Sequence, residues 1–236
     1  MKKTILATGK SKTIYTTDDP NLLVMEFRDD ATAFNGVKKA SLARKGKVNN
    51  HFNAHVMQLL AAENIAVHFV KLLSETESLV KKLDMIRIEF VVRNVVAGGI
   101  SKRLGIEEGM VLPEPTLELF LKDDALGDPM INESHVHVFN WAKDEEIAEL
   151  KQRTLRINTI LKAFFAKAGL TLVDFKLEFG RADGKLLLGD EFTLDGCRVW
   201  DTKTQKKFDK DRFRRDLGEV IESYEEAAER LGIDVL

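Results

Sequence analysis

One stretch of the chain, residues 173–191, constrains the fold more than any other. Apolar and polar residues alternate from Val173 to Phe179, which is the period of a β-strand with one buried face. Asp183-Gly184 then gives a tight-turn signal between two β-like runs, so the stretch is predicted to form a hairpin. Folding the chain about this turn brings Asp190 roughly opposite Glu178.

The polar face of this predicted hairpin carries an unusual set of charges. Asp174, Lys176 and Glu178 follow one another along it, and adjacent carboxylates such as Glu178 and Asp190 repel each other. A Mg²⁺ ion would relieve that repulsion, because it takes oxygen ligands from one or two carboxylates together with substrate phosphates. Lys176 would then contact phosphate oxygens. The alternative is a solvated face with ion pairs, but the second strand, residues 186–188, is apolar on both faces and is predicted to be buried.

Charge and composition exclude several classes of protein. The 236 residues include 36 basic and 38 acidic side chains, for a net charge of −2, which argues against a nucleic-acid-binding protein. The length permits one large domain or two small lobes. The single cysteine, Cys197, rules out a disulfide framework and indicates a reducing, cytoplasmic compartment. No apolar run approaches the length of a membrane span, so no membrane partner is expected.

The N-terminal residues are predicted to form an antiparallel meander of three short strands, over 4–8, 13–16 and 22–27. Its first turn is Gly9-Lys10-Ser11-Lys12, where backbone amides and a lysine could cover a polyphosphate. A solvated hairpin tip is the alternative. The chain contains neither a Walker A sequence nor Gly-x-Gly-x-x-Gly, so a nucleotide would have to be bound in another way.

The middle of the chain gives three further predictions. Residues 28–46 are polar and read as a long loop, a candidate lid. Residues 47–63 carry a helical apolar stripe. A strand over 86–96 delivers Arg93 to Ala97-Gly98-Gly99 before a short helix, an arrangement that suits a phosphate or carboxylate ligand, with a surface ion pair as the alternative.

Helices dominate the predictions for the later part of the chain. The clearest spans 144–168 and ends at Gly169, and a last amphipathic helix is predicted over 211–231. His135 and His137 are expected to share one face of a strand. Since no cysteine lies near them, they do not predict a zinc site.

Several motifs, in the same order and over nearly the whole chain, resemble the SAICAR synthetase (phosphoribosylaminoimidazole-succinocarboxamide synthase) family. They are Gly-Lys-Ser-Lys at 9–12, Lys-Lys-Leu-Asp-Met at 81–85, Glu-Phe-Val-Val-Arg-Asn at 89–94, Val-Asp-Phe-Lys-Leu-Glu-Phe-Gly at 173–180, Gly-Asp-Glu-Phe at 189–192, Cys-Arg-Val-Trp-Asp at 197–201 and Asp-Lys-Asp-Arg-Phe-Arg-Arg at 209–215. Because these motifs are separate and in register, the resemblance is specific.

The resemblance implies an α+β fold of two lobes: a small antiparallel β lobe, residues 1–85, and a larger α+β lobe, residues 86–236. ATP would lie in the cleft between them, as in ATP-grasp proteins and kinases. The implied reaction is an ATP-dependent ligation of de novo purine synthesis. It joins carboxyaminoimidazole ribonucleotide to L-aspartate through an acyl phosphate, with ATP and Mg²⁺, and releases ADP and phosphate. A homodimer is the expected assembly.

The resemblance also assigns roles to individual residues. It places Lys10, Lys12, Lys82, Met85 and Lys176 at the nucleotide, and Glu178 and Asp190 at the metal. Lys176, Glu178 and Asp190 are the expected catalytic residues. Those expected to bind the ribonucleotide substrate are Arg93, Gly99, Asp174 and Arg198.

Two details depart from the family's pattern or stay open. Gly99 stands where the family usually has a serine, and the loss of one hydrogen bond to substrate would cost about 0.5–1.5 kcal/mol. Thr193-Leu194 likewise replaces the usual Ser-Pro. The residues that recognise aspartate are not apparent: Arg214 and Arg215 are candidates, but they could equally pair with acids on the last helix.

Two other functions fit a nucleotide cleft of this kind. A small-molecule kinase would release ADP without any amine substrate. A non-catalytic nucleotide-sensing module would bind ATP without turnover, although two arginines near a second pocket speak against it.

Overall fold

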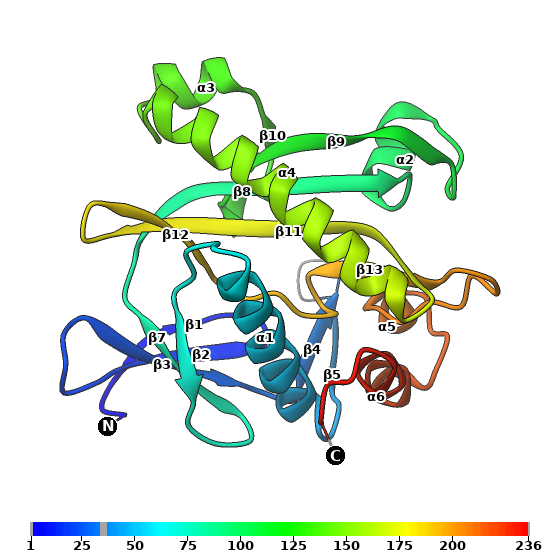
Figure 1. Cartoon of the computed structure of the whole chain (residues 1–236), viewed down its shortest axis with the longest axis horizontal. Coiled ribbons are helices and arrows are strands. Elements are labelled where there is room, and N and C mark those ends of the chain that lie inside the picture. Colours follow the sequence, from blue (N-terminus) through cyan, green and yellow to red (C-terminus); the bar gives the residue numbers. More distant parts are fainter. Residues whose placement is uncertain (1, 34–36, 236) are drawn as a thin grey trace.

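The computed structural model describes residues 2–33 and 37–235, which form antiparallel sheets covered by helices (Figure 1). A five-stranded sheet has the order β1 (Ile5–Thr8), β2 (Lys12–Thr16), β3 (Leu22–Phe27), β7 (Glu77–Lys81), β6 (Phe69–Leu72). A six-stranded sheet has the order β10 (Met130–Ile131), β9 (Val111–Leu121), β8 (Asp84–Val95), β11 (Leu170–Ala182), β12 (Lys185–Gly189), with β13 (Cys197–Asp201) also paired to β11. A separate hairpin joins β4 (Asp30–Ala33) and β5 (Lys38–Ser41). The α+β fold expected from the sequence is confirmed.

Two long helices cover these sheets. α4 (Asp144–Lys167) packs across β8 and β11, whereas α1 (Lys45–Ala62) packs on β3 and β6 (Figure 1). The shorter helices are α2 (Gly99–Leu104), η1 (Asp124–Leu126), α3 (Glu133–Val138), α5 (Asp211–Arg214) and α6 (Val220–Arg230). Within the described residues, no helix is long and apolar enough to cross a membrane.

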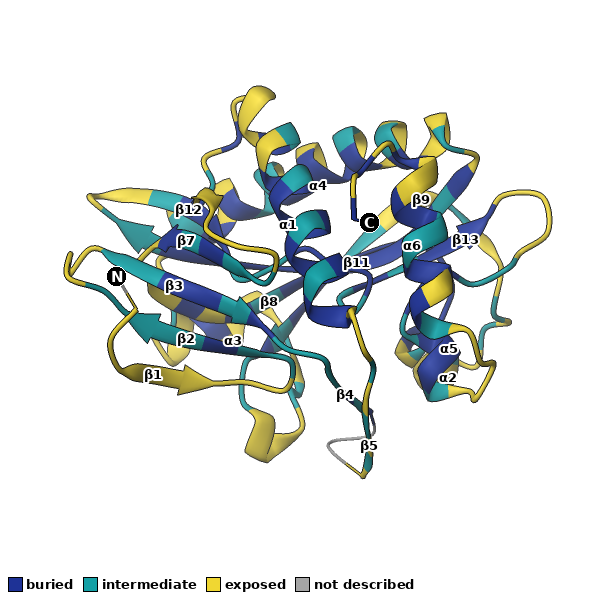
Figure 2. Cartoon of the chain, turned by 90° about the horizontal axis from the view of Figure 1, so that it is seen from below, coloured by how far each residue is buried: buried dark blue, intermediate teal, exposed yellow. Residues whose placement is uncertain are grey.

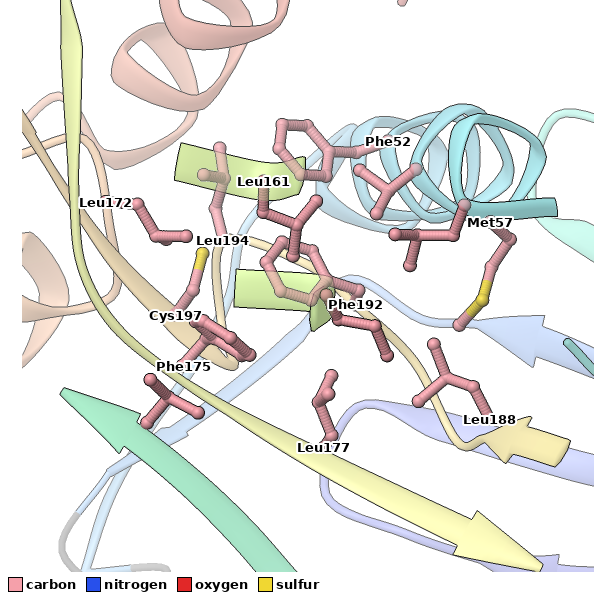
Figure 3. Close-up of a cluster of buried hydrophobic side chains, with 14 of the residues drawn as sticks. Phe52, Met57, Leu161, Leu172, Phe175, Leu177, Leu188, Phe192, Leu194 and Cys197 are labelled. Carbon is pink, nitrogen blue, oxygen red and sulfur yellow. The ribbon is translucent and has the colours of Figure 1, made fainter. Parts of the chain in front are cut away.

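One hydrophobic core joins the two larger sheets (Figure 3). Phe52 of α1, Leu161 of α4 and Phe175 of β11 all lie in it and are almost completely buried. The single thiol, that of Cys197, belongs to the same core. Because the apolar side of β11 packs here, its polar side chains face the other way.

The sequence predictions for the central hairpin are largely confirmed. β11 and β12 meet at the predicted turn, and Glu178 pairs with Gly189, so Asp190 lies one residue beyond the position opposite Glu178. The alternation is wrong at one residue: a β-bulge between Leu172 and Asp174 sends Val173 into a separate small cluster. A bulge adds one residue to one strand and so shifts the facing of its neighbours.

Three other sequence predictions are corrected by the structure. The 28–46 segment is not a loop: it contains β4 and β5, which project from the body (Figure 2), while residues 34–36 lie outside the described residues. His135 and His137 lie on α3 instead of on a strand, because the Asn132 side chain caps the helix by accepting from the His135 N–H. The last helix is two helices, since residues 216, 218 and 219 adopt positive φ angles that no α-helix tolerates.

Candidate active site

A cavity of about 670 Å³ lies between the five-stranded and six-stranded sheets. It is lined by the β1–β2 turn, the 81–85 connection, β8, β11 and the loop after β12. Of the eleven site residues predicted from the sequence, ten line it: Lys10, Lys12, Lys82, Met85, Arg93, Asp174, Lys176, Glu178, Asp190 and Arg198. Gly99 is the exception, at the start of α2.

One end of the cavity is apolar. Side chains from the five-stranded sheet and from the 81–85 connection line it, namely Leu6, Ile14, Leu23, Met25, Val80, Leu83 and Met85. Gly180 and Gly189 allow the connection to pack closely on the central hairpin. A Cβ on Gly180 would lie 2.7 Å from the Leu83 Cβ, and one on Gly189 would lie 2.8 Å from Leu83 Cδ1. An apolar slot beside the 81–85 connection suits a flat heterocyclic ring.

Next to this slot lies a group that we call the lysine cluster: Lys12, Lys122, Lys176, Glu89, Glu178 and Asp190. The Lys176 ammonium contacts Glu178 and lies 3.2 Å from Glu89 Oε1 and 3.3 Å from Asp190 Oδ2. Lys122 Nζ lies 2.6 Å from Glu178 Oε1, and Lys12 pairs with Asp190. With three cations and three carboxylates, the cluster is close to neutral.

Burial and charge act in opposite directions within the lysine cluster. Burial raises the pKa of Glu178, and the nearby Asp190 carboxylate raises it further. Burial also works to raise the pKa of Asp190, but Lys12 and Lys176 outweigh it and hold that pKa well below its usual range. Burial alone would lower the pKa of Lys176, yet the surrounding carboxylates raise it well above its ordinary value. The charges within the cluster therefore favour the ionised forms of Lys176 and Asp190 against the effect of burial, whereas burial and Asp190 both favour the protonated form of Glu178.

The lysine cluster offers the oxygen donors that a magnesium ion uses. Within residues 2–33 and 37–235, no three His, Cys, Asp or Glu side chains are arranged to hold a metal ion by themselves. Magnesium, however, is usually held by one or two carboxylates together with phosphate oxygens and water. Glu178 and Asp190 fit that partial donor set, with lysines at hand for the phosphate oxygens.

The other end of the cavity holds what we call the arginine cluster: Arg93, Arg198, Asp174, Asp211 and Glu118. Asp174 Oδ2 accepts from both arginines, with Nη1 of Arg93 and Nη1 of Arg198 each at 2.8 Å. Arg93 Nε also donates to Glu118 at 2.8 Å, and Arg198 Nε donates to Asp211 at 2.9 Å. These bonds follow from strand register, because Asp174 pairs with Arg93 on β8 and with Arg198 on β13.

The arginine cluster is more deeply buried than the lysine cluster. Burial raises the pKa of Asp174 in spite of its two arginine partners. Burial acts to lower the pKa of Arg198, but Asp174 and Asp211 raise it above its ordinary value. Guanidinium groups held by several acceptors keep a fixed orientation.

Two adjacent glycines border the arginine cluster and differ in the space around them. Gly98 has a φ of +64°, and a Cβ there would lie 2.3 Å from Arg198 Nη2. A Cβ on Gly99 would lie 4.0 Å from Arg93 Nη2 and 3.8 Å from Arg103 Nη1, which is ordinary van der Waals contact. A side chain at position 99, where the family usually has a serine, would therefore point toward two arginines and would have room.

Several residues of the site were not predicted from the sequence. Glu89 and Lys122 complete the lysine cluster, and Glu118 and Asp211 complete the arginine cluster. For Glu89 a signal exists, since it lies on the polar face of an alternating strand. Its position beside Lys176, however, depends on the pairing of β8 with β11, which no local pattern reveals.

Comparisons with known proteins agree with this geometry. The chain matches the family described as SAICAR synthetase over residues 5–231. A phosphoribosylaminoimidazole-succinocarboxamide synthase from Hahella chejuensis is 62% identical over 228 residues, which are 97% of each chain.

Solved structures give the same result. A phosphoribosylaminoimidazole-succinocarboxamide synthase from Ehrlichia chaffeensis superposes with a TM-score of 0.96 at 42% identity, covering 98% of this chain and 99% of that one. A SAICAR synthetase in complex with ADP superposes with a TM-score of 0.93 at 46% identity, covering 95% of this chain and 96% of that one. With its fold and nearly its whole length in agreement, the chain belongs to the SAICAR synthetase family.

Proposed function

We propose that the cavity carries out the ATP-dependent ligation of carboxyaminoimidazole ribonucleotide with L-aspartate, the purine-biosynthesis reaction of this family. One observation carries the proposal. Asp174, Lys176 and Glu178 lie on one face of β11. Lys176 and Glu178 belong to the lysine cluster, which suits a triphosphate, and Asp174 belongs to the arginine cluster, which suits a sugar phosphate, so the two clusters adjoin along this strand. A transferable phosphoryl group and its acceptor would thus meet along a single strand.

The nucleotide would occupy the end of the cavity nearest the five-stranded sheet. Its base fits the apolar slot beside Met85, and its phosphates fit beside Lys10, Lys12, Lys82 and Lys176. The family member solved with ADP supports nucleotide use. Glu178 and Asp190 would hold Mg²⁺, which when bound would neutralise charge on the transferred phosphoryl group.

The ribonucleotide would be held at the arginine cluster. Arginine has five N–H donors in a planar fork, and the bonds to Asp174, Glu118 and Asp211 leave donors free on both Arg93 and Arg198. Such donors bind phosphate in a fixed orientation. Asp174 would keep the two forks aligned.

The chemistry has two steps. A carboxylate is a poor electrophile, so a carboxylate oxygen of the ribonucleotide first attacks the γ-phosphorus of ATP, giving an acyl phosphate and ADP. The amine of aspartate then attacks the acyl carbon, the bond to phosphate breaks, and the amide and inorganic phosphate form. Lys176 would stabilise the phosphoryl oxygens during transfer.

Water must be kept out while the acyl phosphate exists, because it would hydrolyse the intermediate. The segment 28–46 remains our candidate for the closing element. It adjoins the nucleotide end of the cavity, where Arg28 Nη2 donates to the Gly9 carbonyl at 2.9 Å.

Three further assignments belong to the proposal. A lobe boundary near residues 85 and 86 is supported by the sheets, because β1, β2, β3, β6 and β7 come before it, whereas β9 to β13 and all but the first two residues of β8 come after it. Assembly as a homodimer is supported by the family resemblance. Cytoplasmic location is supported by the buried free thiol of Cys197 and by phosphorylated substrates.

Replacing Glu178 with alanine tests the assignment. We expect turnover to be abolished while circular dichroism and the unfolding midpoint show a folded protein. Glu145→Ala, at an exposed position of α4, is the control and should keep full activity. Unchanged kinetics in Glu178→Ala, at saturating ATP and Mg²⁺, would remove the proposed site.

A second assay separates the three functions that the sequence left open. ADP release is measured with the ribonucleotide, with and without aspartate. A ligase needs aspartate for sustained turnover, a kinase releases ADP and accumulates a phosphorylated product without it, and a nucleotide-sensing module releases no ADP in either case.

A further inference from the structure

Polar side chains occupy one buried side of α1, where an amphipathic helix would normally present apolar ones. Lys45, Asn49 and Asn53 are spaced four residues apart, so they share one face of the helix. Each of them is at most 1% exposed. Burial of such groups is unfavourable unless they find partners. We call these three residues the polar stripe of α1.

All three side chains of the polar stripe contact the same segment, the loop that follows β12. Asn53 Oδ1 accepts from the Phe192 N–H at 2.9 Å. One turn earlier on the helix, Asn49 Nδ2 donates to Asp195 Oδ2 at 3.2 Å. The Lys45 ammonium lies 2.5 Å from the same carboxylate oxygen. The loop therefore lies along the helix and is held at two points, Phe192 and Asp195.

This loop begins with a carboxylate that would hold magnesium. Asp190 directly follows β12 and has a φ of +53°, a left-handed conformation that is uncommon for a residue other than glycine. Such a conformation persists only where the surrounding structure holds it. The Asp190 side chain pairs with Lys12 and lies 3.3 Å from Lys176 Nζ. The hydrogen bond from Asn53 holds the backbone only two residues further on, at Phe192.

Packing fixes the backbone at Phe192 from a second side. The ring lies in the hydrophobic core (Figure 3), with its centroid 5.7 Å from that of Phe175 and 6.5 Å from that of Phe165. Rotation of the backbone here would either break the hydrogen bond to Asn53 or move the ring out of the core. Asp190 is thereby joined to a point of the chain that has little freedom to move.

We propose that Asn53 is a positioning residue for the magnesium ion that accompanies the nucleotide. Through the Phe192 N–H it fixes the loop after β12, and so sets the direction in which the Asp190 carboxylate enters the lysine cluster. No residue of α1 lines the cavity, so Asn53 acts through Asp190 and not by contact with the ligand. This assignment rests on the proposed function and adds to it a residue outside the cavity.

A second asparagine on the same helix provides a matched control. Asn50 is as fully buried as Asn53, but it holds the turn between β6 and β7. Its Nδ2 donates to the carbonyls of Ser74 and Glu75, each at 3.1 Å. Its Oδ1 accepts from Ser78 Oγ at 2.6 Å. None of these three partners lines the cavity, so Asn50→Ala should lower the unfolding midpoint, as Asn53→Ala should, without affecting magnesium.

The first experiment measures the binding of ADP by calorimetry, with and without Mg²⁺. Removal of a group that orients a metal ligand typically lowers metal affinity by about 10–100-fold. In Asn53→Ala, the tightening of ADP binding by Mg²⁺ should therefore fall by about tenfold or more, whereas the Kd for ADP without Mg²⁺ should change by less than about twofold. In Asn50→Ala, both values should match those of the unaltered protein.

Turnover gives a second readout. The Mg²⁺ concentration that gives the half-maximal rate should rise about tenfold in Asn53→Ala. The KM for the ribonucleotide should stay unchanged, because that substrate would be held at the arginine cluster. Asn53→Leu, which fills a similar space without an acceptor, replaces Asn53→Ala if the latter fails to fold.

Three results would overturn the assignment: an equal Mg²⁺ dependence in Asn53→Ala and Asn50→Ala, a change in Asn53→Ala confined to the unfolding midpoint, or a loss of ADP binding that is the same with and without Mg²⁺. Failure of the proposed function looks different. In that case ADP binding to the unaltered protein would not respond to Mg²⁺, and no turnover would depend on both the ribonucleotide and aspartate.

Discussion

The lysine cluster and the arginine cluster share one strand and one cavity, but they are built from different cations. In the lysine cluster, the Lys176 ammonium is shared among Glu89, Glu178 and Asp190. In the arginine cluster, each guanidinium donates through separate nitrogens to separate carboxylates. An ammonium is a compact charge on a flexible stem, whereas a guanidinium is a rigid fork.

This difference matches what each end of the cavity would have to do. A phosphoryl group that moves between two molecules requires several positive charges near its oxygens, and the Lys176 ammonium lies among three carboxylates where it could also contact such oxygens. A sugar phosphate that serves as a handle requires donors that stay in place. We therefore expect substitutions in the arginine cluster to affect stability as well as binding, and substitutions in the lysine cluster to affect mainly turnover.

The largest predicted effect is a difference in stability between the variants Arg93→Met and Lys122→Met. The Arg93 side chain is 7% exposed and its partner Asp174 is 5% exposed. Removing the arginine leaves Asp174 with Arg198 and Glu118 with Arg103, so the loss of its charged hydrogen bonds should lower the free energy of unfolding by about 1.5–3 kcal/mol. The Lys122 side chain is 40% exposed, and its loss should cost less than about 1 kcal/mol. Urea unfolding measures both values, and equal losses would contradict the comparison.

The next effect tests how tightly the arginine cluster is packed. In Gly98→Ala the new methyl group would overlap the Arg198 guanidinium, so Arg198 must leave Asp174 or Asp211. We expect KM for the ribonucleotide to rise about tenfold or more, in line with the loss of one charged hydrogen bond. Gly105→Ala is the control, because Gly105 has a similar φ of +67° with nothing within 4 Å. The Gly105→Ala variant should lose stability through the same backbone strain but keep an unchanged KM for the ribonucleotide.

A third prediction concerns pH and a carboxylate next to the arginine cluster. Asp209 is fully buried, and burial together with the negative charge of Asp211 raises its pKa to about 7. The folded protein therefore keeps a proton there that the unfolded chain releases near pH 3.8, so this group's contribution to stability is present below about pH 4 and is lost as pH rises through about 7.

Asp209→Asn should remove that dependence. Relative to the unaltered protein, the variant's free energy of unfolding should rise steadily across this pH range. Parallel pH profiles for the two proteins, measured by urea unfolding, would show that Asp209 titrates normally.

The smallest predicted effect restores the serine that is usual in the family. Gly99→Ser places a hydroxyl near Arg93 without a steric clash, and one hydrogen bond of about 0.5–1.5 kcal/mol should lower KM for the ribonucleotide by up to about tenfold. Gly99→Ala, which adds the β-carbon without the hydroxyl, should leave KM for the ribonucleotide unchanged. An equal effect of both substitutions would mean that packing, and not the hydroxyl, is responsible.

Local patterns in the sequence predicted those parts of the fold that local forces determine. The Asp183-Gly184 turn and the apolar stripe of α4 each depend on a local signal, and both are confirmed. The alternation along β11 is confirmed except at Val173, where the bulge interrupts it. The 28–46 segment was mistaken for a loop because β4 and β5 are short and mostly polar. The break between α5 and α6 was missed because the apolar stripe continues across it.

The site could be predicted only where one strand brings its residues together. Asp174, Lys176 and Glu178 were found because they share a face of β11. Glu89 and Lys122 come from other elements, and their positions follow from tertiary pairing that the sequence pattern does not encode. The family resemblance supplied Lys10, Met85 and Arg198, which the residues alone would have left as a hairpin tip, a connection and a polar loop.

The buried thiol of Cys197 has a practical consequence. Burial raises its pKa well above the usual range, so the sulfur stays protonated and unreactive in the folded protein. Alkylating reagents should therefore label the chain only in molecules that have opened. Because the sequence contains no other cysteine, the rate of labelling would time the opening of the core directly, with no engineered probe.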